Sequence, residues 1–142
     1  MEQDISLFVD AIGAIEPKPG DETYLKYKQI FKRSNYFIYE GHFLVIKISR
    51  SDRPFWGIGK AYVELLNGVS KYFLVLLTSP KSGWLFSKHE VNHKIKNGDW
   101  PLKDKDREYK INPPSLRYEN RFNSIEQFIG KIGVLLPKKI SE

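Results

Sequence analysis

Apolar residues along the chain follow two different spacings, and each spacing predicts a different kind of element. Near the N-terminus they stand three and four residues apart between Ile5 and Ile15, which predicts a helix with one buried face. Prolines and a glycine at residues 17–20 are expected to end it. Residues 23–33 show a similar spacing and also fit a helix, although less clearly.

Two continuous apolar runs predict strands that are covered on both faces. Residues 43–46 follow a turn at Glu40 and Gly41, so we expect them to form a hairpin with residues 36–40. Residues 72–77 predict a second buried strand. Further helices are expected at residues 59–66, 88–97 and 124–132, and further strands at residues 84–86 and 108–111.

This order of elements predicts an α/β fold, with one central mixed sheet flanked by helices. The 142 residues fit a single domain spanning 1–142, and 41% hydrophobic and 28% charged residues are ordinary values for a folded protein. The absence of cysteine excludes disulfides, thiol catalysis and cysteine-ligated zinc.

Charge divides the chain into two parts. Residues 1–22, the predicted N-terminal helix and its linker, contain six acidic residues and one lysine, a net charge of −5. Residues 23–142 form a basic body with 22 basic and 11 acidic residues, a net charge of +11. A basic surface suits a polyanion, because neutralised phosphates release condensed counterions. Solubility alone is the alternative explanation for this charge.

The same patterns bear on location. Glu2 and Asp4 stand where a signal peptide would have basic residues, and the apolar runs are too short to cross a bilayer. We therefore expect a cytoplasmic protein with no membrane partner.

One short segment matches the spacing of a zinc motif. His89, Glu90 and His93 form H-E-x-x-H, which on a helix places two imidazoles on one face to bind zinc, while the glutamate activates water. Glu108 or Glu119 would be candidates for a third ligand. The motif therefore raises the hypothesis of a zinc-dependent hydrolase.

The neighbours of this motif favour another role. Ser87 and Glu90 form S-x-x-E, the capping box that begins a helix. Lys88 and Lys94 flank the motif, and their charges would repel a dication. We expect helix capping here and no bound zinc.

The elements from residue 36 to residue 91 resemble the core of the PD-(D/E)XK nucleases, the restriction-endonuclease-like superfamily. In that family a central strand ends in E-x-K and is followed by a crossover helix and another strand. The resemblance implies that Lys47 is the family lysine, which positions water beside Mg²⁺. Val45 stands where the family has its carboxylate, and Glu40 is the nearest acid that could replace it.

The resemblance therefore implies either a Mg²⁺-dependent nuclease that uses Glu40 and Lys47 or a binding domain without catalysis. A simpler alternative for Lys47 is a lysine at a strand end whose ammonium reaches solvent.

Basic and aromatic residues gather in residues 50–60. Arginines there can contact phosphate or guanine, Trp56 can stack on a base, and Gly57 and Gly59 can let a phosphate approach the start of a helix. The alternative is that Trp56 belongs to the core, and Trp84 and Trp100 share this ambiguity. The residues predicted to contact nucleic acid are Arg50, Arg53, Trp56, Lys60, Trp84 and Lys88.

From these patterns we predict a nucleic-acid-binding domain, with DNA favoured over RNA. The alternatives are a zinc hydrolase at His89 and His93 and a non-catalytic module that binds other proteins.

Overall fold

The computed structural model describes residues 3–18, 35–68, 71–103, 105, 107–113 and 116–136. The helix expected at residues 23–33 lies outside this part. The described helices are α1 (Gln3–Ile12), α3 (Lys60–Asn67), α4 (Lys88–Lys96), α5 (Ile125–Leu135) and the 3₁₀ helix η2 (Tyr118–Asn120). The described strands are β1 (Asn35–Tyr39), β2 (His42–Ile48), β3 (Trp56–Gly59), β4 (Tyr72–Ser79), β5 (Ser82–Ser87), β6 (Leu102–Lys103), β7 (Glu108–Ile111) and β8 (Arg121–Phe122).

A five-stranded mixed sheet forms the centre of the molecule, in the order β1-β2-β4-β5-β8. Strands β2 and β4 are parallel, and every other neighbouring pair is antiparallel. A parallel pair needs a crossover connection, which β3 and α3 provide. This arrangement confirms the predicted α/β fold with a central mixed sheet.

The predicted hairpin between β1 and β2 is present. Glu40 and Gly41 form its turn with φ angles of 49° and 77°, and two positive φ angles suit a tight hairpin turn. The adjacent pair Tyr39 and His42 closes the ladder, and Asn35 pairs with Ile46 at its other end.

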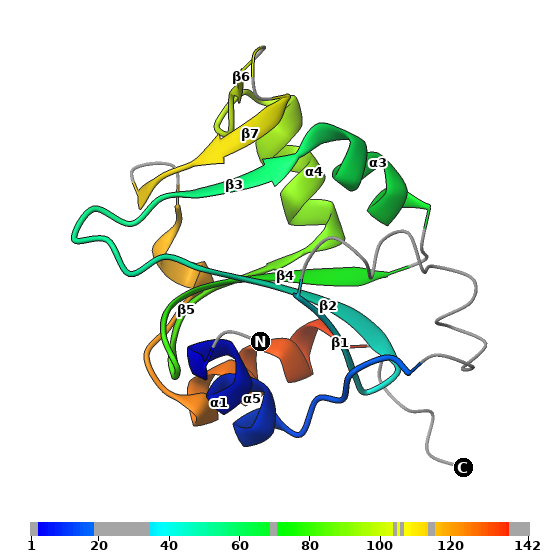
Figure 1. Ribbon diagram of the computed structural model, residues 1–142, viewed down its shortest axis with the longest axis vertical. Helices are drawn as coiled ribbons and strands as arrows, with labels where there is room; N and C mark the ends of the chain where they lie inside the picture. Colours follow the sequence, from blue (N-terminus) through cyan, green and yellow to red (C-terminus); the bar gives the residue numbers. More distant parts are fainter. Residues whose placement is uncertain are drawn as a thin grey trace.

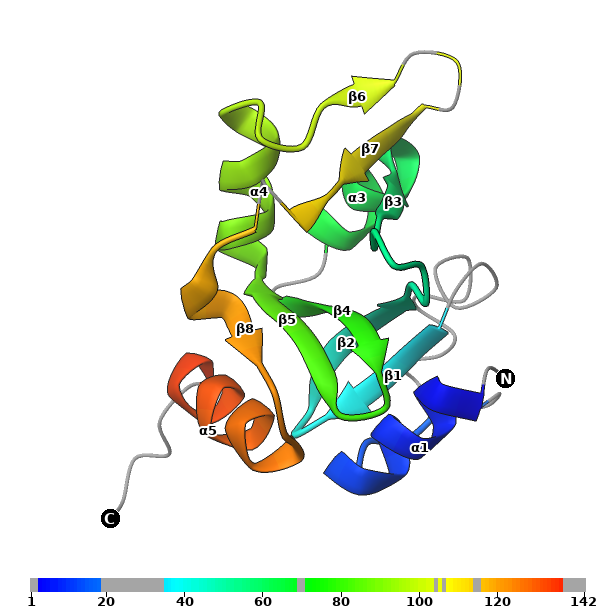
Figure 2. The same cartoon turned by 90° about the vertical axis from the view of Figure 1, so that its left-hand side faces the viewer.

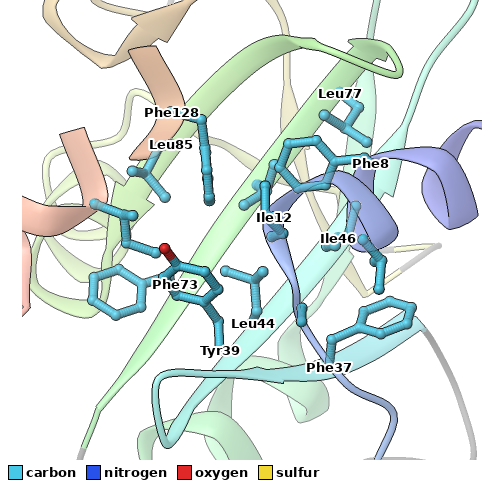
Figure 3. Close-up of a cluster of buried hydrophobic side chains, with 14 of the residues drawn as sticks. Phe8, Ile12, Phe37, Tyr39, Leu44, Ile46, Phe73, Leu77, Leu85 and Phe128 are labelled. Atoms are coloured by element: carbon cyan, nitrogen blue, oxygen red, sulfur yellow. The ribbon is translucent and has the colours of Figure 1, made fainter. Parts of the chain in front are cut away.

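Helices α1 and α5 cover one face of the sheet, as Figure 1 shows below the strands. Alternate residues of β2 and β4, including Leu44 and Ile46, pack there against Phe8, Phe128 and other apolar side chains of the two helices (Figure 3). This side of the core is made of aliphatic and aromatic groups.

The opposite face is covered by a second, three-stranded sheet together with α3 and α4 (Figures 1 and 2). The strands of this second sheet lie in the order β3-β7-β6. The other alternate residues, such as Phe43 and Val45 of β2, pack against Trp56, Leu66 and Trp100. Strands β2 and β4 are therefore covered on both faces, as their continuous apolar runs predict.

Helix α1 confirms the predicted amphipathic spacing up to Ile12. It ends there because Gly13 has φ 75°, and Ile15 instead forms a bridge to Ile38 and is 63% exposed. Among the described helices, none has the length and apolar character needed to cross a membrane.

Candidate functional site

A pair of side chains on neighbouring strands marks the edge of the central sheet. Trp84 of β5 lies opposite Arg121 of β8 in the antiparallel ladder, which places the guanidinium 4.3 Å from the centre of the indole ring. The ring of Trp84 also packs edge to face against the ring of Trp56, with 5.7 Å between the ring centres, so Trp84 contacts the core. Partial burial lowers the pKa of Arg121 from its ordinary value, which lies far above neutral pH.

The turn before β8 is fixed by the buried side chain of Asn120. Its amide donates to the Leu85 carbonyl at 2.8 Å and to Glu90 Oε2 at 2.7 Å. Lys131 of α5 donates to the Glu119 carbonyl at 2.7 Å. These bonds attach η2 to β5, α4 and α5, and thereby position Tyr118 beside Arg121.

Two adjoining clefts open around this turn, and we call them together the groove. The first has a volume of about 370 Å³, and the second about 600 Å³. Tyr118, Arg121 and Asn123 line both. The remaining lining residues are Trp84, Leu116 and Arg117 in the first cleft, and Glu119, Gln127, Gly130, Lys131 and Val134 in the second.

The groove combines positive charge with flat and apolar surfaces. Arg117, Arg121 and Lys131 outnumber the one carboxylate, Glu119. Tyr118 is 88% exposed, so its ring is open to a ligand. Guanidinium groups bind phosphate, and aromatic rings stack on bases, so this combination matches the chemistry of a nucleic-acid strand.

The predicted binding loop at residues 50–60 differs from the expectation, because its tryptophan is buried in the structure. Trp56 is 3% exposed, and its indole N–H donates to the Leu77 carbonyl at 3.3 Å. Its ring therefore belongs to the core and is not open to a base. Arg50 forms an ion pair with Asp4 at 3.4 Å, and Arg53 is exposed.

The two glycines of this loop also serve the fold. Residues 56–59 form β3, and a Cβ atom on Gly57 would overlap the carboxylate of Glu108, a residue of the paired strand β7. Gly59 is the N-cap of α3 in an extended conformation. Gly57 therefore makes room for a carboxylate, which would repel a phosphate.

The remaining residues predicted to contact nucleic acid lie in different parts of the fold. Lys60 is exposed at the start of α3, and Lys88 donates to the Asn67 carbonyl at 3.1 Å. Trp100 is buried at 1% exposure, whereas Trp84 lines the groove. Contacts of Arg50, Arg53, Lys60, Trp84 and Lys88 with nucleic acid stay predictions.

Glu40 and Lys47 do not come together. Glu40 is exposed at the hairpin turn, while Lys47 lies five residues beyond His42 on β2, a separation of roughly 17 Å along an extended strand. The carboxylate that influences Lys47 is Glu108: burial lowers the pKa of Lys47, and the charge of Glu108 partly opposes that shift.

The residues around Lys47 do not fit a magnesium site. Glu108 supplies one carboxylate, but Lys110 lies 3.8 Å from its Oε1 and Lys47 is close by. Mg²⁺ is held through oxygen ligands, and two ammonium groups beside a single carboxylate disfavour it. The residues around Lys47 therefore give the nuclease hypothesis no support, and it stays a prediction from the resemblance alone.

The H-E-x-x-H segment lies on α4, with exposed and nearly parallel histidine rings 6.4 Å apart. Glu90 accepts hydrogen bonds from the Ser87 backbone and from Asn120, so both carboxylate oxygens are occupied. The predicted capping box is confirmed. In the part of the chain that the structure describes, no group of three or more His, Cys, Asp or Glu side chains could hold a metal ion.

The sequence patterns single out Trp84 but not its partners in the groove. Arg117, Tyr118 and Arg121 form the pattern R-Y-x-x-R between a proline pair and a helix, which is the signal that could have revealed them. Comparison of the chain with protein-family models, curated proteins and solved structures finds no match.

Proposed function

We propose that this protein binds nucleic acid through the groove beside Trp84 and Arg121. The observation on which the proposal rests is the guanidinium of Arg121, held 4.3 Å from the Trp84 ring centre where the two clefts meet. A preformed position lowers the entropy lost when the guanidinium binds a phosphate.

The surroundings of Arg121 support this function. Its Nε donates to Asn123 Oδ1 at 3.1 Å, which fixes the plane of the guanidinium. Arg117 adds a second exposed guanidinium in the first cleft. The excess of 22 basic over 11 acidic residues in residues 23–142 gives the whole body an attraction for polyanions.

The test compares two arginines that have different surroundings. Fluorescence anisotropy with labelled DNA and RNA, as a single strand of about 12 nucleotides and as the matching duplex, gives the affinity. We expect Arg121→Gln to weaken binding about tenfold, since one charged contact with phosphate is lost. Arg107→Gln, at an exposed position directly before β7 that lines neither cleft, is the matched control and should change affinity less than about twofold.

Salt dependence gives an independent measure of the same contact. The logarithm of the association constant should fall linearly with the logarithm of salt concentration between about 50 and 200 mM. For a single strand, Arg121→Gln should make this slope shallower by about 0.7. Absence of binding at low salt, or a larger effect of Arg107→Gln than of Arg121→Gln, would refute the proposal.

A further inference from the structure

Tyr118 has a position that its contribution to folding does not explain. It is the first residue of η2, and its side chain is 88% exposed although the turn itself is fixed through buried Asn120. Both clefts of the groove share Tyr118 as a lining residue. The ring therefore lies on a fixed turn and borders both clefts.

The amide groups of the groove are oriented by their partners. Arg121 Nε can only donate, so the atom of Asn123 that faces it at 3.1 Å is Oδ1. The Asn123 backbone N–H likewise donates to Gln127 Oε1 at 2.7 Å. These bonds occupy the carbonyl oxygens of both side chains and leave the NH₂ groups of Asn123 and Gln127 as donors, and both residues line the second cleft.

These features suit bases whose faces and edges are open. In a duplex each base is stacked between its neighbours and its Watson–Crick edge is paired. An exposed aromatic ring therefore has no free base face to stack on, and the amide donors have no free Watson–Crick edge to bind. In a single strand the bases can be splayed apart, stacked on an aromatic ring and hydrogen-bonded along their free edges. Leu116 and Val134 add apolar surface to the two clefts.

We propose that the groove is specific for single strands, and that Tyr118 stacks on a base while Arg121 binds the adjacent phosphate. This proposal rests on the proposed function and narrows it from nucleic acid in general to unpaired strands. The amide NH₂ groups of Asn123 and Gln127 contact the edges of the bases that enter the second cleft.

The experiment measures affinity for a single strand and for a duplex of the same sequence, using wild type and four variants, one of which is Arg121→Gln. We expect wild type to bind the single strand at least tenfold more tightly. Tyr118→Ala should lose about tenfold in single-strand affinity, because it removes the ring on which the base stacks, and should change duplex affinity less than about twofold. Tyr118→Phe keeps the ring and should bind like wild type.

Phe55→Ala is the matched control, because Phe55 is also an exposed aromatic residue, at 54%, next to arginine-containing sequence. It should leave both affinities unchanged. Circular dichroism of each variant verifies that the fold is retained.

The outcomes separate this proposal from the function on which it rests. Equal affinity for single strand and duplex, with both weakened by Arg121→Gln, would overturn single-strand specificity while the groove remained a binding site. A loss in Tyr118→Phe as large as in Tyr118→Ala would overturn the stacking role. Failure of wild type to bind either nucleic acid would overturn both proposals.

Discussion

The loop at residues 50–55 and the segment at residues 116–123 both combine two arginines with an exposed aromatic ring. In the loop, Arg50 forms an ion pair with Asp4, and the ammonium of Lys110 lies 5.4 Å from the centre of the Phe55 ring. In the segment, Arg121 lies over Trp84, and Tyr118 lines two clefts.

The two regions also differ in what their tryptophan does. Trp56 follows the loop and is part of the core, whereas Trp84 forms a wall of the groove. Similar residues thus serve packing in one region and line a ligand-sized hollow in the other. Residue types in a stretch of sequence therefore indicate a possible chemistry, while burial decides whether that chemistry is accessible.

The largest expected effect concerns stability and separates the two tryptophans. Trp56→Ala should lower the free energy of unfolding by about 3–5 kcal/mol, since it leaves a cavity between the two sheets. Trp84→Ala should lower it clearly less, because Trp84 is half-buried at the sheet edge. Urea unfolding followed by circular dichroism measures both, and equal losses would contradict the different roles of the two tryptophans.

A smaller effect concerns Gly57 and the carboxylate beside it. Gly57→Ala should lower the free energy of unfolding by about 1–3 kcal/mol, because its Cβ would displace the Glu108 side chain. In a Glu108→Ala background the same change should be less destabilising. A double-mutant cycle from urea unfolding gives the coupling, and a coupling near zero would show that Gly57 does not serve to accommodate Glu108.

Glu90 links the H-E-x-x-H segment to the groove. Glu90→Gln should lower the free energy of unfolding by about 1 kcal/mol, because an amide cannot accept from both the Ser87 backbone and Asn120. Glu119→Gln, the same change on an exposed neighbour, is the control for charge. An equal effect of both variants on thermal unfolding would argue against the anchoring role.

Lys47 should have the mildest effect, which depends on pH. Burial lowers the pKa of Lys47 in the folded protein below its ordinary value of 10.5. At pH values between the folded-state pKa and the ordinary value, the unfolded chain binds more protons than the folded protein, so the free energy of unfolding rises with pH. Lys47→Met removes this dependence and should be the more stable form at neutral pH. Urea unfolding from neutral to alkaline pH should show the difference shrinking as pH rises, and a constant difference would contradict the pKa shift.

Sequence patterns predict most of the central sheet because its strands are strongly apolar. Residues 43–46 and 72–77 lie within β2 and β4, and the capping box at Ser87 and Glu90 begins α4 as expected. Strand β3 escapes prediction because W-G-I-G is a poor strand pattern, and pairing with β7 supplies its stability.

The candidate site is harder to predict, for a physical reason. Trp84 and Arg121 are far apart in sequence and become neighbours through a strand pair of two residues. Trp56 and Gly57 match a binding motif locally, but the fold uses them for packing. Tertiary contacts decide both cases, and no local spacing encodes them.

The most direct test of the binding groove is to locate where a single strand touches the protein. A single strand containing photoreactive 4-thiouridine can be cross-linked to the protein by irradiation, and mass spectrometry of the digested product identifies the attached residue. The groove predicts cross-links at Tyr118 or elsewhere in residues 116–123. Cross-links at Phe55, with none in residues 116–123, would contradict it.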